Sequence, residues 1–324
     1  YCMAPIVATQ PSWFYVMVVV TVLLLTELKH TFTEFAQRMK NDEMITLAKF
    51  LAISGIILPM LPHKNLIPDI NLTPYSIWLA TVVVSGISYL SYLLKRYVFH
   101  ESGTLVSGII GGLYSSTATI SVLARKSRKA SEQEATDYVA AMLLAVSMMF
   151  LRFMILILIF SREIFLSIYP YLLTMAVVAA IVAWFIHSRQ KRPEDQPAET
   201  EEDDSSNPLE FKVALIFAVL FVIFTFLTHY TLVYAGTGGL NLLSFVSGFS
   251  DITPFILNLL QNTGSVAALI VTACSMQAII SNIMVNMFYA LFFAGKGSKL
   301  RPWILGGFGV VIACNLVLLL FFYI

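Results

Sequence analysis

The chain has 324 residues, of which 58% are hydrophobic and 12% are charged, and its mean hydropathy is +0.81. A soluble globule cannot cover its surface with so few polar side chains, so the composition indicates an integral membrane protein. The net charge of +1 gives no reason to expect a nucleic-acid partner, and no cofactor is expected.

The apolar segments predict the fold class. They run for about 20 residues or more, enough for a helix to cross roughly 30 Å of hydrocarbon, whereas the strands of a membrane barrel alternate over about 10 residues. We therefore expect an all-α membrane protein. The apolar segments are 12–28, 45–61, 74–94, 103–124, 139–160, 164–187, 213–235, 238–264, 266–294 and 303–324.

The N-terminal part, residues 1–73, holds the first two apolar segments. The chain begins at Tyr1 without a basic leader, so we expect no signal peptide and a natural N-terminus that lies further upstream. Between the two segments, residues 29–43 place Phe32, Phe35 and Met39 on one helical face, as in an interfacial helix. These two helices are predicted to serve as a scaffold or as contacts within a homo-oligomer.

Two apolar segments, 103–124 and 238–264, are rich in glycine, and the basic residues that flank them do not fit ordinary spans. If all ten segments crossed the membrane, the loops would divide their Lys and Arg residues ten to nine, although cytoplasmic loops normally hold most of them. If these two segments enter and leave on the same side, seventeen of the twenty cations lie inside, Lys64 and Arg162 lie outside, and Arg152 lies within the bilayer. The sequence thus predicts eight spanning helices and two re-entrant hairpins in a bacterial inner membrane.

The two hairpins give the chain an internal symmetry. Residues 74–192 and 209–324 both read helix, hairpin, helix, helix, but start from opposite faces, which is typical of inverted repeats in transporters. The acidic segment 193–208 between them is predicted to be a cytoplasmic linker. The expected hairpin breaks are Gly111, Gly112, Gly248 and Pro254. Alignment of Gly112 with Gly248 pairs Ser115 with Asp251 and Thr117 with Thr253.

Asp251 is the only formally charged residue between Lys212 and Lys296. An ionised carboxylate at that depth needs a partner, a bound cation or a proton, so Asp251 is a candidate ion-binding residue together with its neighbours Ser250 and Thr253. A structural alternative is that Asp251 caps the half-helix that begins near Thr253. The two roles are compatible.

The counterpart in the first hairpin is a cluster of hydroxyl groups. Ser115, Ser116, Thr117 and Thr119 follow the Gly111-Gly112 pair. Hydroxyls and free N–H groups at the start of a helix suit an anion or the hydration waters of an ion. Small hydroxyl side chains also let membrane helices pack closely, and this alternative stays open.

Three further polar residues fall inside apolar helices. Arg152 cannot release its proton and needs an acceptor within the bundle, which could be Asp251, a carbonyl group of a hairpin or an anionic substrate. Asn282 and Asn286 are four positions apart and share one helical face. They are candidate ion ligands, with polar contacts between helices as the alternative explanation.

Other chemistry finds little support in the sequence. Cys2, Cys274 and Cys314 are far apart, so they predict neither a disulfide framework nor a metal cluster. The five His residues show no metal-ligand spacing, and no nucleophile and base are paired in a known motif, so we do not expect an enzyme.

The strings Val84-Ser85-Gly86-Ile87-Ser88-Tyr89, Gly111-Gly112-Leu113-Tyr114-Ser115-Ser116-Thr117-Ala118-Thr119 and Ser247-Gly248-Phe249-Ser250-Asp251 carry a resemblance. The chain resembles a family of uncharacterised bacterial membrane proteins in which this region follows a domain similar to MgtC/SapB, a domain associated with magnesium limitation. The resemblance implies that Arg152 and Asn282 are family positions, whereas Asn286 stands where a basic residue is expected.

These observations favour an ion transporter or channel-like protein with a polar site at mid-membrane, whose partners would be a small inorganic ion or small anion and the lipid bilayer. The alternative is a membrane regulator or sensor, by analogy with MgtC-like proteins, whose polar interior is structural. A transporter needs water to reach Asp251 and Arg152, whereas a regulator can seal them.

Overall fold

The computed structural model describes residues 17–23, 26–27, 29, 41–67, 70, 72–99, 103–128, 132–189, 211–261, 267–295 and 299–323. The chain forms two compact units, Tyr1–Ala52 and Ile53–Ile324. In the first unit, residues 17–23 are helical and α3 spans Asn41–Ala52. About half of the predicted span 12–28, and residues 30–40 of the predicted interfacial segment with Phe32, Phe35 and Met39, lie outside the described residues.

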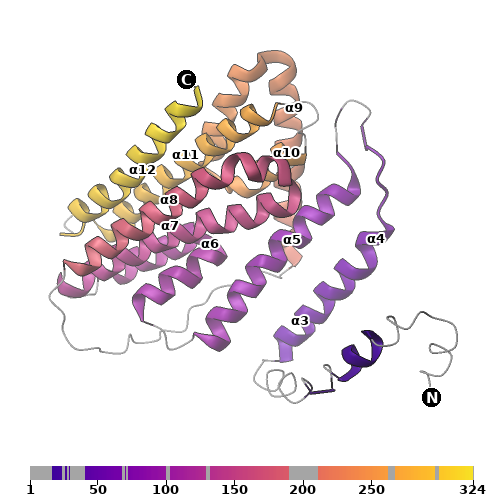
Figure 1. The fold of residues 1–324 in the computed structure, drawn as a ribbon, viewed down its shortest axis with the longest axis horizontal. Helices are drawn as coiled ribbons and strands as arrows, with labels where there is room; N and C mark the ends of the chain where they lie inside the picture. Colours follow the sequence, from indigo (N-terminus) through magenta and orange to yellow (C-terminus); the bar gives the residue numbers. More distant parts are fainter. Residues whose placement is uncertain are drawn as a thin grey trace. The chain divides into compact units, whose positions relative to one another are not determined.

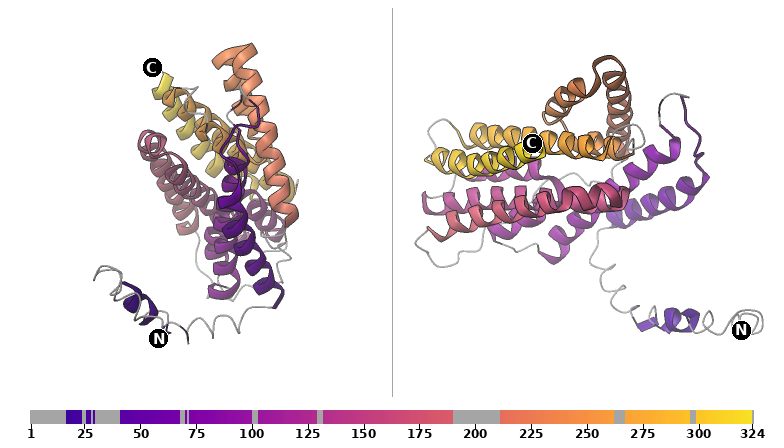
Figure 2. Two further views of the ribbon diagram at one scale, coloured as in Figure 1. Left: turned by 90° about the vertical axis from the view of Figure 1, so that its right-hand side faces the viewer. Right: turned by 45° about the horizontal axis from the view of Figure 1, so that its top comes forward.

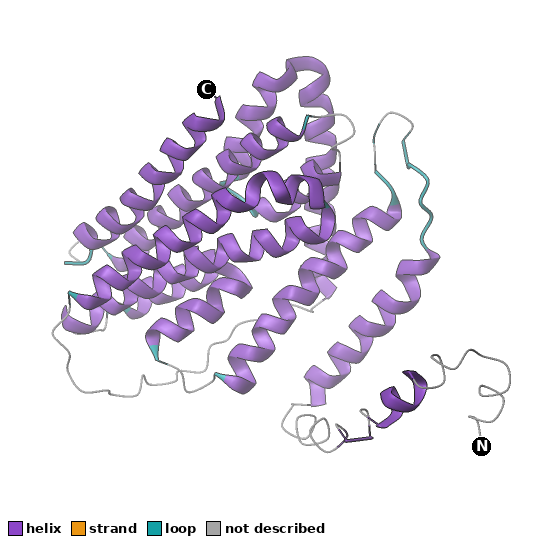
Figure 3. Ribbon diagram, in the orientation of Figure 1, coloured by secondary structure: helices purple, strands orange, loops and turns teal. Residues whose placement is uncertain are grey.

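The second unit is built from helices (Figures 1 and 3). Among its described residues the one extended pairing is the isolated bridge between Ile67 and Ile70. The helices are η1 (Ile53–Ile57), α4 (Leu58–Met60), α5 (Pro74–Leu93), η2 (Leu94–Val98), α6 (Thr104–Lys126), α7 (Glu132–Phe160), α8 (Arg162–Ser188), α9 (Phe211–Ser247), α10 (Ile252–Gln261), α11 (Ala268–Ala294) and α12 (Arg301–Tyr323).

Eight helices of the described residues are long and apolar enough to cross a membrane, which confirms the predicted class of all-α, multi-pass membrane protein. Their outer faces carry large apolar side chains such as Trp184, Tyr234 and Leu320. Such faces are unfavourable in water but suit contact with lipid. The deepest helix is α11, whose buried residues include Ser281, Asn282 and Asn286.

The helix starts follow local sequence signals. Thr73 and Ser76 form a capping box at the start of α5, with bonds of 2.9 and 3.1 Å, and Pro74 fits the first helical position. Ser161 separates α7 from α8 and caps the latter through the N–H of Ile164. These caps fix where the chain leaves one helix and enters the next.

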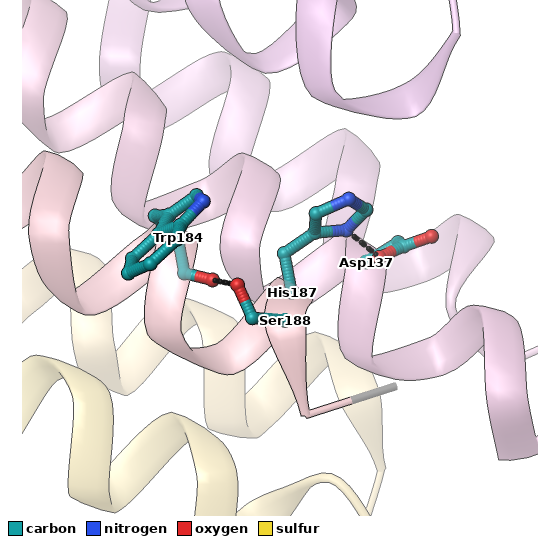
Figure 4. Close-up of polar contacts among 4 residues, drawn as sticks. All are labelled: Asp137, Trp184, His187 and Ser188. Atoms are coloured by element: carbon teal, nitrogen blue, oxygen red, sulfur yellow. Dashed lines mark hydrogen bonds and ion pairs between the residues drawn. The ribbon is translucent and has the colours of Figure 1, made fainter. Parts of the chain in front are cut away.

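The helices α7 and α8 form an antiparallel pair. The Ser147 hydroxyl on α7 donates a 2.8 Å hydrogen bond to the Ala176 carbonyl on α8. At the far end, Asp137 Oδ1 lies 2.6 Å from His187 Nδ1 (Figure 4). Asp137 is near the N-terminal end of α7 and His187 is in the last turn of α8, so this contact joins the start of one helix to the end of the other.

Two helices are interrupted within their length. In α6 the backbone of Ser115 is extended (φ −159°, ψ 106°). In α9 the interruption is Gly236, whose φ of 60° and ψ of −154° are accessible to glycine and almost no other residue. A side chain on Gly239 would lie 2.9 Å from Thr231 Cγ2, eight residues earlier, so α9 folds back at Gly236, as Figure 2 shows.

Candidate functional site

The first part of the site is the bend in α6. A Cβ atom on Gly111 would lie 2.5 Å from Thr119 Oγ1. In a straight helix, residues eight positions apart are separated by about 12 Å, so the two halves of α6 fold back against each other. We call residues 113–117 at this bend the first tip. The Ser115 hydroxyl accepts a 3.4 Å hydrogen bond from the N–H of Ala118 and caps the second half.

The second part is the break between α9 and α10, residues 247–251, which we call the second tip. Its turn bonds back onto α9, with Gly248 N to Phe245 O at 3.3 Å, Phe249 N to Val246 O at 3.1 Å and Ser250 N to Ser247 O at 3.1 Å. Asp251 Oδ1 accepts a 2.9 Å hydrogen bond from the N–H of Thr253. Asp251 therefore caps α10, as the structural alternative predicted, while its side chain is exposed on the protein surface.

A glycine beside or within each tip allows close contact with a long helix. A Cβ on Gly112 would lie 2.5 Å from Ala145 Cα on α7, and a Cβ on Gly248 would lie 2.3 Å from Ser281 Cβ on α11. Neither approach leaves room for a side chain. In both cases the glycine precedes its partner by 33 positions. The two tips are therefore packed in the same way on α7 and α11.

Arg152 on α7 contacts the first tip. Its Nη1 donates a 2.7 Å hydrogen bond to the carbonyl of Tyr114, and its Nη2 donates a 3.3 Å bond to the Ser88 hydroxyl on α5. Its Nε is buried without a hydrogen-bond partner among the described residues. Asp251 at the second tip lies near this guanidinium without a direct ion pair. Arg152 thus contacts the first tip and faces a carboxylate of the second.

A hydrogen-bond chain on α11 joins the tips. Thr117 Oγ1 of the first tip donates to Asn286 Oδ1 at 2.8 Å, and Asn286 Nδ2 donates to Asn282 Oδ1 at 3.2 Å. Asn282 Nδ2 then donates to the carbonyl of Gly248 in the second tip at 3.2 Å. Both Asn side chains are buried, so these bonds satisfy polar groups that water does not reach.

The structure brings together Thr117, Arg152, Asn282 and Asn286, which are predicted site residues on three helices. The others act within their own segment. The Ser250 hydroxyl donates to Ser247 O, Thr253 is buried at the start of α10, Ser116 is buried, and Thr119 packs on Gly111.

The predicted hairpin breaks lie close to the observed ones, with a shift in the first. Gly111 and Gly112 are helical and serve as contact points, while the break falls three residues later at Ser115. A small residue in a membrane helix can mark a close contact as well as a break. Gly248 lies in the turn of the second tip, and Pro254 lies in the first turn of α10, where a missing N–H is tolerated.

Sequence reasoning missed Ser88, and it predicted a hairpin carbonyl as one possible acceptor for Arg152 without identifying Tyr114. Ser88 is one of three serines, Ser85, Ser88 and Ser91, spaced three positions apart on one side of α5, and this spacing was the available signal. A backbone carbonyl leaves no signal in the side-chain sequence. Among the described residues, no three His, Cys, Asp or Glu residues are grouped so that they could hold a metal ion.

Comparison with known proteins gives two matches. Residues 82–294 match the family described as Domain of unknown function (DUF4010). The chain is also 24% identical over 227 residues to an uncharacterised protein of Aquifex aeolicus (strain VF5), a match that covers 68% of this chain and 96% of that protein. No solved structure matches the chain. Neither description mentions an MgtC/SapB-like domain, so that association stays a prediction.

Proposed function

We propose that this chain, which belongs to the family described as Domain of unknown function (DUF4010), moves small ions across a bacterial inner membrane through a site between its two tips. The observation that carries the proposal is the position of Arg152. A permanent cation inside an apolar helix contacts one helix break and interacts electrostatically with the lone carboxylate at the other. Ionisable residues inside membrane helices most often mark ion pathways.

The lengths of the half-helices support two re-entrant hairpins. In α6, residues 104–114 and 116–126 form halves of 11 residues each. The second hairpin would combine residues 237–247 with α10, which has 10 residues. Helices of this length extend about 16 Å, roughly half the hydrocarbon thickness, so each tip would lie near the midplane.

The matching glycine contacts support an inverted repeat. The same separation between Gly112 and Ala145 as between Gly248 and Ser281 means that each hairpin packs in the same register on the helix that follows it. In this proposal, α5 to α8 form one repeat and α9 to α12 the other. Transporters of this kind bind their substrates where two such repeats meet.

A membrane regulator is the second candidate. The observation that favours it is the closed hydrogen-bond chain from Thr117 to Gly248, in which the buried amides already have partners. In a regulator, this chain would hold the bundle together and no ion would pass.

Ion flux into proteoliposomes separates the two candidates. Purified protein would be reconstituted and screened with Na⁺, K⁺, Mg²⁺, protons and small anions, with protein-free liposomes as the background. We expect flux of at least one ion above that background and its loss in Arg152→Gln. Arg162→Gln removes a cation at the exposed start of α8 and serves as the matched control. The absence of flux for every ion would reject transport and favour the regulator.

A further inference from the structure

At the two tips, most hydrogen-bond acceptors already have donors, whereas some donors have no acceptor within the part of the chain that the structure describes. Five carbonyl groups at or beside the tips accept bonds from identified donors. They are Tyr114 from Arg152, Gly248 from Asn282, and Phe245, Val246 and Ser247 from the N–H groups of the second tip. The one carboxylate, Asp251, accepts from the Thr253 N–H. A bare cation would therefore share these oxygens with donors that already bind them and would have only their remaining lone pairs.

Two buried polar groups beside the tips, in contrast, have no hydrogen-bond partner among the described residues. Arg152 Nε is buried with no hydrogen-bond partner among the described residues. The hydroxyl of Ser281, which lies against Gly248, is fully buried and likewise lacks one within the described part of the chain. A buried polar group without a partner costs about 1–3 kcal/mol, and a charged group costs more. The Arg152 Nε–H can only donate and so favours a ligand that accepts hydrogen bonds, whereas the Ser281 hydroxyl can donate to such a ligand as well as accept.

The positive charge of Arg152 also favours an anion. Arg152 carries a permanent positive charge. The starts of two half-helices, at Ser116 and at Ile252, place positive dipole ends at the tips, and the half-helices that end at residues 114 and 247 place negative ends there. The full charge of Arg152 therefore decides the sign of the field at the first tip. The carboxylate of Asp251 at the second tip is a negative charge near Arg152, and it caps α10 rather than bonding the guanidinium directly.

We infer that the site binds a small monovalent anion, a halide or a planar oxyanion, with Arg152 as its principal ligand. This inference rests on the proposed function and specifies its substrate class. The edge of a guanidinium that includes Nε offers two parallel N–H groups, which suits a planar oxyanion. Asp251 and the anion compete for the same positive charge, so removal of the carboxylate charge strengthens anion binding.

The first test is thermal unfolding of the purified wild-type protein in detergent. Sodium nitrate and sodium chloride are compared with sodium gluconate at equal sodium concentration, and in a second series Na⁺, K⁺ and choline are exchanged at constant chloride. We expect the melting temperature to rise with nitrate or chloride by a few degrees and to saturate, since a ligand that binds the folded state stabilises it. A melting temperature that follows the cation instead would overturn the inference.

The second test is anion flux in variants. Arg152→Gln should lose anion flux, Arg152→Lys should retain part of it because the charge is kept, and Asp251→Asn should lower the half-saturating anion concentration by about tenfold because a nearby negative charge is removed. Asp137→Asn removes a carboxylate outside the site and is the matched control. If Asn258→Asp, which adds a carboxylate in α10 away from the tips, weakens anion flux as strongly as Arg152→Gln does, a general charge effect replaces the site and the inference fails.

The outcomes separate this inference from the proposal on which it rests. Flux of a cation that is lost in Asp251→Asn and kept in Arg152→Gln would reject the anion site and leave ion transport standing. Saturable stabilisation by anions that depends on Arg152, without flux of any ion, would support the anion site and reject transport. Neither stabilisation nor flux would reject both.

Discussion

Thr117 in the bend of α6 and Asn286 on α11 are 169 positions apart in the chain, and a 2.8 Å hydrogen bond joins their side chains. It is the side-chain contact through which the first tip reaches the chain of amides that ends at the second tip. The bond therefore connects the two halves of the proposed repeat at their polar centre.

Replacement of Thr117 by valine keeps the shape of the side chain and removes the hydroxyl. The buried oxygen of Asn286 then loses its donor, and we expect a loss of about 1–2 kcal/mol of stability, visible as a lower melting temperature in detergent. Thr117→Ser retains the donor and should lie close to the wild type. Equal melting temperatures for the valine and serine variants would show that the bond contributes nothing.

The glycine contacts predict at which positions a substitution by alanine destabilises the protein. Gly248→Ala would place its Cβ 2.3 Å from Ser281 Cβ, and we expect destabilisation of about 1–3 kcal/mol from overpacking. Gly306→Ala on α12 is the control, because nothing lies within 4 Å of its added Cβ.

The partner of Gly248 offers a rescue that the partner of Gly112 does not. The nearest atom to the added Cβ of Gly248→Ala belongs to the Ser281 side chain, so Ser281→Gly should restore part of the stability, whereas Gly112→Ala meets the backbone of Ala145. Failure of Ser281→Gly to improve Gly248→Ala in a thermal scan would show that the Asn282 backbone is the limiting contact.

Arg152 and Asp251 should be energetically coupled. Arg152→Met leaves the carboxylate without its nearby cation and frees the Tyr114 carbonyl, while Asp251→Asn keeps an oxygen that can cap α10. Because the two charges attract each other, the double variant should be more stable than the sum of the single effects predicts, by about 0.5–2 kcal/mol. A double-mutant cycle in detergent measures this difference, and strict additivity would rule the coupling out.

The membrane topology can be tested by labelling of single cysteines in a variant that lacks the natural ones. Arg128→Cys follows α6 and Thr237→Cys follows the fold-back of α9, and both positions are exposed. Two re-entrant hairpins place position 128 in the cytoplasm and position 237 outside. Reaction of position 128 with an impermeant maleimide added to intact cells would mean that α6 crosses the membrane.

The sequence predicted the long helices well because their apolar segments are long and are bounded by caps such as Thr73 and Ser161. It also located both interruptions to within a few residues, because glycine and small polar residues are rare in the middle of apolar segments. It also ended one apolar segment at residue 235 and began the next at 238, and the structure interrupts α9 between them, at Gly236.

The contacts of the site were harder to predict for a physical reason. The acceptor of Arg152 is a backbone carbonyl that a bend in α6 leaves open, and such a group exists only once the chain has folded. The two predicted roles of Asp251 differed by geometry alone, and only the distance to the Thr253 N–H identifies the cap. Periodicity places a residue on a face of its helix but does not say which residue on a distant helix lies opposite.

The fold-back at Gly236 has a practical consequence. The turn is held by a backbone conformation that glycine adopts, and no other atom approaches the space where its side chain would be. A rigid helical domain inserted just after Gly236 would therefore be held by a helical segment of α9 on each side of the insertion. In the proposed topology, where this turn lies outside the membrane, such a fusion would give this small membrane protein a recognisable mass outside the detergent micelle, which is the feature that particle alignment in electron cryomicroscopy requires.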